Sequence, residues 1–424
     1  MSPVSRRRSV AAAAVTLAFA AQAAFVSLAS AERSTPPPTP VPPKGSPSPF
    51  VSDLRTPEDH LTTPSIGGAE ALLADLDTGQ AMFAKAPALR RPIASLTKLM
   101  TALIVLERRK PQDVVTVSPD AVFASDDYGA TSTLGLRAGE QLTVRNLLYA
   151  LLLQSSNDAA EALAIDVSGS VEAFTKLMNR RAAQLGMRDT RFFSPHGLDD
   201  RGRSTARDLL RLIRASYDTR GFAPIVATKF ATIPAPTGPP RVVQNRNVLL
   251  WLYPGAIGAK TGLTFGAGFC VIAVAERGDR RLVSIVLDGD GEPFSDAATL
   301  LNFGFDGFTE RTFVEEGEPV GDVRVRGGTV PVVAGADIRA LVPTADLDAI
   351  EPKLVASPRA AYPPPVGERI GTIAITSPGV TYGSAPLLAT RVELPPPPDG
   401  GPWWARAASA VGGAVLDVVD GLAS

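Results

Sequence analysis

The sequence Ser95-Leu96-Thr97-Lys98 opens a stretch in which leucines recur at helical spacing. Leu99, Leu103 and Leu106 predict a helix over Ser95–Arg109, with Ser95 near its N-cap. Three residues are nearly one helical turn, so the serine hydroxyl and the lysine amine can project from one face. A desolvated lysine can take the proton of a serine nucleophile, whereas arginine cannot, because its pKa is too high. Alone, the pattern is more typical of a capped helix with a solvated lysine.

A second polar group, Ser155-Ser156-Asn157, directly follows the apolar run Leu147–Leu153. In an extended or turn conformation, a hydroxyl and an amide two residues apart can point the same way. The same residues are typical of a turn or cap that leads into the next helix, and for this group alone that role is favoured.

The third group, Lys260-Thr261-Gly262, precedes strand-like sequence. A lysine and a hydroxyl on an edge strand can hold a carboxylate, and a glycine lets a ligand approach the backbone closely. Alone, the group could equally be a strand start with a solvated lysine. The order Ser-x-x-Lys, Ser-x-Asn and Lys-Thr-Gly is the serine set of β-lactamases and penicillin-binding proteins, and the whole set favours a functional interpretation.

With these motifs the chain resembles the low-molecular-mass penicillin-binding proteins, the serine-type D-Ala-D-Ala carboxypeptidases of bacterial cell walls. The resemblance covers residues 67–309 strongly and 310–395 more loosely. Four further stretches look like flanking patterns of that family: Leu134-Gly135-Leu136-Arg137-Ala138-Gly139-Glu140, Pro195-His196-Gly197-Leu198-Asp199-Asp200, Ser204-Thr205-Ala206-Arg207-Asp208 and Asn245-x-Asn247-x-Leu249-Leu250.

The resemblance implies an α/β fold, a β-lactamase/transpeptidase-like domain with an antiparallel sheet flanked by helices, followed by a small all-β domain. It implies removal of the terminal D-Ala from peptidoglycan pentapeptide stems, and covalent inhibition by penicillins. Ser95 would form the acyl-enzyme and Lys98 would accept its proton. Ser155 would pass a proton to the leaving D-Ala, and Asn157 would orient Lys98 and the substrate amide.

The resemblance also assigns substrate contacts to the third motif. Lys260 and Thr261 would bind the terminal carboxylate, beside Gly262. The backbone N–H groups of Ser95 and Leu263 would form an oxyanion hole, which stabilises charge as the tetrahedral intermediate develops. No metal or organic cofactor is implied.

Two alternative functions use the same sequence features. A class A-like β-lactamase has these three motifs, but it deacylates with a glutamate-activated water. The stretch between the second and third motifs holds Pro195-His196-Gly197-Leu198 and no Glu-x-x-x-Asn pattern, so slow release of penicillin is expected. A catalytically silent peptidoglycan adaptor is the other alternative, which the retention of the motif residues disfavours.

Composition sets the remaining limits. The 424 residues suffice for two or three structural units, and the formal charge of −1 argues against a nucleic-acid binder. A single cysteine excludes an intramolecular disulfide framework. Cys270 follows Phe269 in an apolar stretch and should be buried and inert. Neither His60 nor His196 lies in a Ser-His-Asp pattern, and we interpret His196 as a loop-ordering residue.

The first residues of the sequence suggest that the protein is exported. Three arginines, Arg6 to Arg8, precede an apolar stretch that ends at Ala29-Ser30-Ala31, so residues 1–31 are predicted to be a signal peptide. An uncleaved anchor is the alternative. Residues 32–66 are rich in proline and predict an extended spacer. The protein should therefore act outside the cytoplasm.

The globular part has strands at both ends and helices between them. Strands are predicted within Ala71–Lys85, around the turn Asp77–Gln80, and over Ala267–Ala275 and Leu282–Asp288. This arrangement predicts one sheet built from both ends of the unit. Helices are predicted over Asn146–Ile165, Val171–Leu185, Ala206–Tyr217 and Leu300–Phe308.

Residues 310–395 alternate short valine-rich runs with Gly and Pro, which predicts a separate small all-β domain. Residues 396–424 hold a proline break and then a tail with apolar and polar residues on opposite helical faces. Asp417 and Asp420 disfavour a membrane span. We therefore expect an amphipathic helix over Trp403–Ser424 at the outer face of the cytoplasmic membrane, the alternative being a helix docked on the β domain.

Overall fold

The computed structural model describes residues 63–392, except 124–131, 290–291, 359, 361 and 378–379. The predicted signal peptide, nearly all of the predicted spacer and the predicted tail helix lie outside the described residues. The chain divides into two compact units between Gly307 and Phe308.

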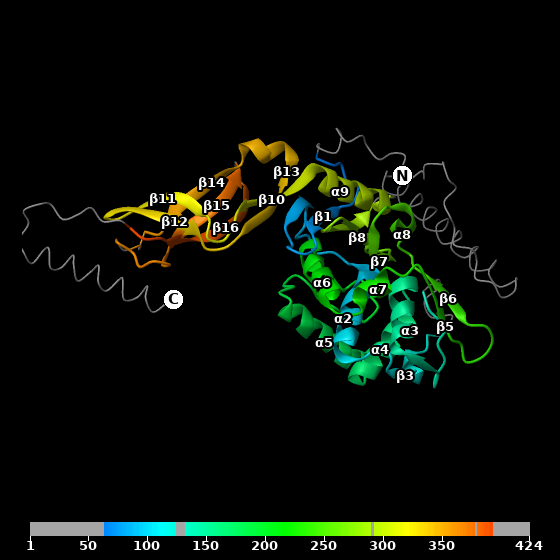
Figure 1. Ribbon diagram of the computed structural model, residues 1–424. Helices are drawn as coiled ribbons and strands as arrows, with labels where there is room; N and C mark the ends of the chain where they lie inside the picture. The colour runs from blue at the N-terminus through cyan, green and yellow to red at the C-terminus, as the bar shows by residue number, and fades with distance from the viewer. Residues whose placement is uncertain are drawn as a thin grey trace, which may run out of the picture. The chain divides into compact units, whose positions relative to one another are not determined.

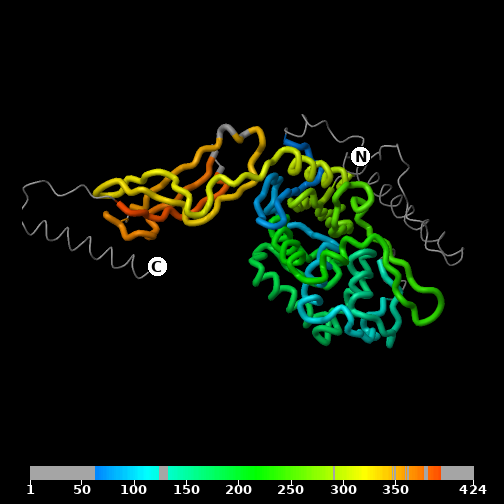
Figure 2. Tube along the Cα trace, viewed as in Figure 1, coloured from blue at the N-terminus to red at the C-terminus, as the bar shows by residue number. Residues whose placement is uncertain are grey.

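The first unit is built on one antiparallel sheet of order β2-β1-β9-β8-β7. Figure 1 labels three of these strands, β1, β8 and β7. Its first strand, β1, pairs with the late strand β9, so one sheet is built from both ends of the unit as the sequence predicted, and Figure 2 shows the blue start of the unit beside its yellow-green end. The turn Asp77–Gln80 lies between β1 and β2 as expected. The strands are β1 (Glu70–Asp75), β2 (Ala81–Lys85), β7 (Ala256–Thr264), β8 (Gly268–Arg277) and β9 (Arg280–Gly289).

Both faces of this sheet are buried, because alternate residues of each strand face opposite sides. On β1, Leu72 and Ala74 join the core that includes residues of helices α2 (Lys98–Arg108), α4 (Asn157–Ser168) and α6 (Ala206–Asp218). Ala71 and Leu73 join a second core, together with residues of α9 (Pro293–Gly307). The sheet therefore lies between α9 on one side and the helical part of the unit on the other.

The helical part lies between β2 and β7 in sequence. It includes two small two-stranded sheets, β3 (Val114–Thr116) with β4 (Gln141–Thr143) and β5 (Phe230–Ile233) with β6 (Arg241–Gln244), which the sequence analysis did not predict. Its helices are α2 (Lys98–Arg108), α3 (Val144–Tyr149), α4 (Asn157–Ser168), α5 (Val171–Gln184), α6 (Ala206–Asp218), α7 (Phe222–Val226) and α8 (Leu249–Leu252).

Three details of the predicted helices were wrong. The helix predicted from Ser95 begins at Lys98: its N-cap is Thr97, and Ser95, expected near the N-cap, lies two residues earlier inside a 3₁₀ turn, Ala94–Thr97. The helix predicted over Asn146–Ile165 is two helices, because a π turn and a left-handed residue interrupt it before Asn157. The last helix begins at Pro293 rather than Leu300, since proline is tolerated in a first helical turn.

The second unit is all β, as predicted. One sheet has the order β11-β12-β16-β15-β14, and β10 pairs with β13. Alternate apolar residues such as Val330, Val332, Ile373 and Ile375 form its core. The strands are β10 (Phe308–Val314), β11 (Pro319–Val325), β12 (Gly328–Ala334), β13 (Ile338–Pro343), β14 (Glu351–Ala356), β15 (Arg369–Ser377) and β16 (Val380–Ala389).

Candidate active site

Ser95 lies in the tight turn that precedes α2, and its side chain is half-buried. The residue before it, Ala94, has φ 46°, a left-handed conformation that is strained for a residue with a Cβ. Gly197 packs directly on this turn, since a Cβ at that position would lie 2.0 Å from the Ala94 carbonyl oxygen. The backbone around Ser95 is therefore closely confined.

Lys98 occupies the first turn of α2, and its side chain is fully buried. Its Nζ atom lies 2.9 Å from Ser95 Oγ, 2.7 Å from Asn157 Oδ1 and 2.7 Å from the His196 carbonyl oxygen. The amine is thus held by two acceptors while it faces the Ser95 hydroxyl.

The electrostatic surroundings favour a neutral Lys98. Burial is the largest cause, and it lowers the pKa of the Lys98 ammonium well below the ordinary lysine value. The positive charges of Lys260 and Arg246 lower this pKa further, whereas the Asp158 carboxylate raises it. A lysine with a lowered pKa can act as a proton acceptor near neutral pH.

Ser155 and Asn157 lie at a sharp corner between α3 and α4. The chain passes through a π turn over Ala150–Gln154, and Ser155 then adopts φ 68°, in the left-handed region. Asn157 starts α4 with its side chain buried and bound to Lys98. A non-glycine residue in this conformation costs about 1–3 kcal/mol and is typical of functional sites.

The third motif lies on β7, at the edge of the sheet. Lys260 is fully buried, its Nζ donates to the Thr261 carbonyl oxygen at 2.8 Å, and burial lowers its pKa well below the usual value. A Cβ at Gly262 would lie 3.0 Å from the Ser95 nitrogen, so β7 passes against the turn that carries Ser95. The next residue, Leu263, is partly exposed.

The structure therefore brings together all three motifs, which lie far apart in the sequence. Lys98 bonds to Asn157, Gly262 touches the Ser95 backbone, and Lys260 is close enough to shift the pKa of Lys98. These contacts place a hydroxyl, a buried amine and a second buried amine in one site.

Arg246 belongs to the same site, and the sequence analysis missed it. Its backbone N–H donates to the Leu153 carbonyl oxygen at 3.1 Å, just before the corner that holds Ser155. The side chain is exposed, its charge lowers the pKa values of both site lysines, and its guanidinium makes no hydrogen bond or ion pair with any described residue. The sequence feature that could have indicated Arg246 is its position between Asn245 and Asn247, in a stretch that looks like a flanking pattern of the family.

His196 orders the loop that contacts Lys98, in line with its predicted role. Its Nδ1 accepts from the Leu198 N–H at 3.1 Å, so the ring proton lies on Nε2, which is 3.3 Å from Glu161 Oε1. The pKa of the His196 ring is lowered, and burial is the largest of several causes. Cys270 is buried, and burial raises the pKa of its thiol to about 12, which is consistent with an inert residue.

A comparison with known families decides the identity of the chain. The family model described as D-alanyl-D-alanine carboxypeptidase, peptidase S11, matches residues 58–291. The chain belongs to this family.

Individual S11 relatives support the same assignment. The D-alanyl-D-alanine carboxypeptidase DacB2 of Mycobacterium tuberculosis is 37% identical over 55% of this chain and 81% of its own length. DacC of Escherichia coli, another D-alanyl-D-alanine carboxypeptidase, is 33% identical over 78% of this chain and 85% of its own. The crystal structure of penicillin binding protein 6B from Escherichia coli has a TM-score of 0.62 at 31% identity, and covers 77% of this chain and 96% of that one.

The predicted family, fold class and enzyme class are therefore confirmed. This S11 member is a serine-type D-Ala-D-Ala carboxypeptidase that acts on peptidoglycan stem peptides and binds β-lactams. Among the described residues, no helix is long and apolar enough to cross a membrane. Within the same ranges, no group of three or more His, Cys, Asp or Glu residues could hold a metal ion.

Proposed function

We propose that this carboxypeptidase works through an acyl-enzyme on Ser95, with Lys98 as the base. The observation that carries the proposal is the 2.9 Å separation between Lys98 Nζ and Ser95 Oγ, with the amine fully buried. A neutral amine at that distance can take the hydroxyl proton as the oxygen attacks.

The reaction has two balanced steps. Ser95 Oγ bonds to the carbonyl carbon of the penultimate D-Ala while its proton passes to Lys98 Nζ, and the C–N bond to the terminal D-Ala breaks. Ser155 relays a proton to the leaving nitrogen, and Asn157 orients Lys98. Water then hydrolyses the ester and restores the serine. The backbone N–H groups of Ser95 and Leu263 bind the oxyanion, since Gly262 lets β7 approach the Ser95 turn.

Two positive charges, those of Lys260 and Arg246, act on the neutral Lys98 in this site, and the Asp158 carboxylate counters their effect on its pKa. Such an excess of positive charge favours an anionic ligand. We assign the terminal carboxylate of the substrate to Lys260 and Thr261, with the free guanidinium of Arg246 as an additional partner. A penicillin presents a carboxylate of the same charge and acylates Ser95 in the same way.

The reaction is tested by mass spectrometry of the full mature protein incubated with a pentapeptide that ends in D-Ala-D-Ala. The expected products are the tetrapeptide and free D-Ala. A fluorescent penicillin in parallel should give a long-lived adduct. Rapid turnover of the penicillin would instead favour a β-lactamase, and the absence of both reactions would favour a silent adaptor.

We also propose that the mature enzyme is held at the outer face of the cytoplasmic membrane by residues 403–424. The support is the sequence pattern of that segment, with apolar residues on one helical face and Trp403 and Trp404 at its start. The full mature protein should sediment with liposomes, while a version that ends at Asp399 stays in the supernatant and keeps its activity. Equal sedimentation of both versions would contradict this anchor.

A further inference from the structure

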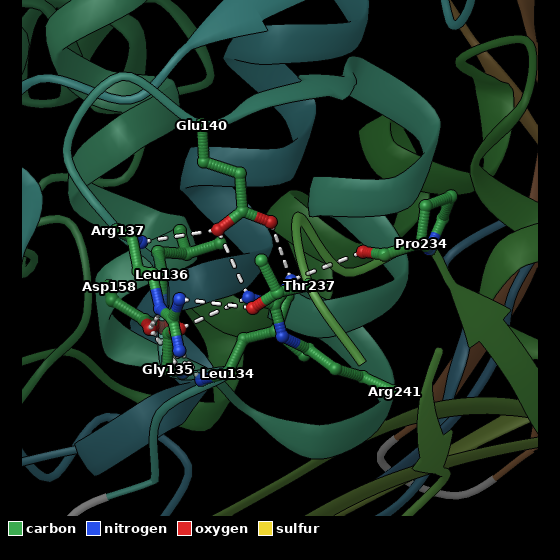
Figure 3. A network of polar contacts seen from close by, with 9 residues as sticks. All are labelled: Leu134, Gly135, Leu136, Arg137, Glu140, Asp158, Pro234, Thr237 and Arg241. Atoms are coloured by element: carbon green, nitrogen blue, oxygen red, sulfur yellow. Dashed lines mark hydrogen bonds and ion pairs between the residues drawn. The ribbon is translucent and has the colours of Figure 1, made fainter. Parts of the chain in front are cut away.

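A buried carboxylate lies immediately after the second motif. Asp158, in the first turn of α4, has 1% of its surface exposed. Figure 3 shows its oxygens surrounded by the backbone of one loop: the N–H groups of Leu134, Gly135 and Leu136 donate to it at 2.9–3.0 Å. The N–H of Ala159 adds a bond of 2.8 Å. Four backbone donors are an unusually complete shell for one carboxylate.

The same loop is tied to the corner that carries the second motif. The Asn157 N–H donates to the Ser132 carbonyl oxygen at 2.8 Å. The Ser132 hydroxyl donates to the Gln154 carbonyl oxygen at 2.6 Å, and the Gln154 amide donates to the Thr133 carbonyl oxygen at 3.0 Å. These bonds fall on both sides of Ser155. The loop therefore braces the strained corner, and Asp158 fastens the loop.

We propose that Asp158 is a positioning residue for the reaction: it holds the loop that braces Ser155 and Asn157, and it presents a negative charge to Lys98. The proposal rests on the roles proposed above for Ser95 and Lys98. Asp158 touches neither the substrate nor the reacting atoms in this account, and it acts through its neighbours.

The charge has a measurable consequence. The charged groups that face Lys98 are Lys260 from β7, Arg246 from the loop after β6, and Asp158 from α4. The His196–Glu161 pair also lies close, because Lys98 Nζ donates to the His196 carbonyl oxygen. Asp158 raises the pKa of Lys98. Lys98 must be neutral to accept a proton, so activity rises with pH through this pKa. Removal of the Asp158 charge should move that rise to lower pH.

The loop provides a matched control in Glu140. Its carboxylate is also buried and also accepts a backbone N–H from this loop, that of Arg137 at 3.2 Å. It forms an ion pair with Arg241, with bonds of 2.6 and 3.0 Å, and Arg241 also donates to the Gly135 carbonyl oxygen (Figure 3). Glu140 thus fastens the same loop from the other side, but it is not among the groups that shift the pKa of Lys98.

The test compares Asp158→Asn, Asp158→Glu and Glu140→Gln in the full mature protein, below the lowest Tm of the set. The second-order rate of acylation by a fluorescent penicillin is measured against pH, together with kcat/KM for the pentapeptide. We expect Asp158→Asn to lower the acylation rate at its high-pH plateau on the order of 100-fold, because a small displacement of Ser155 and Asn157 slows the reaction. The rise of the rate with pH, here called the acid limb, should move to lower pH. Asp158→Glu keeps the charge, so its acid limb should stay near that of the wild type while its rate falls. Glu140→Gln should lower Tm without moving the limb.

The proposal is overturned if Asp158→Asn keeps the wild-type limb, or if Glu140→Gln shifts it equally. If Asp158→Asn does not fold, Asp158→Glu decides, since a wild-type rate in that variant would show that the position of the carboxylate does not matter. A wild-type enzyme without an acid limb, or with its adduct on another residue, would instead refute the base role of Lys98. The two failures are therefore distinguishable.

Discussion

Lys98 Nζ lies 2.9 Å from Ser95 Oγ, and the two side chains differ sharply in exposure. The lysine is fully buried, whereas the serine is half-buried. This difference matters, because burial holds down the pKa of the amine while the hydroxyl remains reachable by a substrate. Fixed acceptors on Asn157 and His196 keep the amine in place.

Replacement of Lys98 by arginine should nearly abolish activity although arginine is also a basic residue of similar length. Arginine stays protonated at any working pH and cannot accept the serine proton. We expect kcat/KM to fall roughly 100- to 10,000-fold, the usual contribution of a general base, with no recovery between pH 6 and about 10. Substantial activity of Lys98→Arg at neutral pH would remove lysine from the role of base. Lys176→Arg, at an exposed position on α5, is the control.

Lys260→Ala should distinguish substrates by their C-terminal charge. The lost interaction is with a carboxylate, so peptides with a free C-terminus should lose more kcat/KM than peptides with an amidated end. Arg246→Gln should show the same bias to a smaller degree, since its side chain is exposed. Parallel losses on both substrates would mean that these cations act on something other than the terminal carboxylate.

Gly262→Ala should slow acylation without unfolding the protein. The added Cβ would lie 3.0 Å from the Ser95 nitrogen and 3.1 Å from the Ile93 carbonyl oxygen, so β7 and the Ser95 turn must separate. We expect the rate of penicillin acylation to fall on the order of 100-fold. Gly67→Ala, where the nearest atom lies at 3.4 Å, is the control and should acylate normally. A normal rate in Gly262→Ala would show that the close approach is dispensable.

Glu70→Gln should change how stability depends on pH. Glu70 is buried on β1, and burial, the largest cause, raises its pKa from 4.5 to about 7. The unfolded chain therefore releases this proton earlier than the folded protein, so stability falls as pH rises from 4.5 to 7 and is level above that. Wild type should lose up to about 3 kcal/mol more than Glu70→Gln over this window.

Urea unfolding at several pH values measures that difference. Glu172→Gln, at an exposed glutamate of α5, is the control and should follow the wild type. If Glu70→Gln also follows the wild type, Glu70 keeps an ordinary pKa in the folded protein.

Much of the fold could be predicted from the sequence, because its strands and helices have clear periodicity. Strands at both ends of the unit were enough to predict a single sheet. A turn or cap was favoured for Ser155-Ser156-Asn157 alone, yet the helix predicted over Asn146–Ile165 ran through it, since the leucines of 147–153 suit a continuous helix as well as a π turn. The start of this helix was predicted at Ser95 rather than Lys98, because 3₁₀ and α turns share the same local residues.

The candidate site could be predicted only where residue spacing carried information. Ser95, Lys98 and Asn157 were within reach of motif reasoning. Arg246 and Asp158 were not, because their importance comes from neighbours distant in the chain: the site lysines for one, and the loop at 134–136 for the other. A lone arginine or aspartate has no spacing signal of its own.

The central claim is an acyl-enzyme on Ser95, and peptide mapping after penicillin labelling tests it most directly. The wild-type protein is incubated with a penicillin, digested and analysed by mass spectrometry, beside Ser95→Ala and Ser156→Ala. We predict one adduct on the peptide that contains Ser95, present in wild type and Ser156→Ala and absent from Ser95→Ala. An adduct on any other residue, or one that survives in Ser95→Ala, would contradict the account.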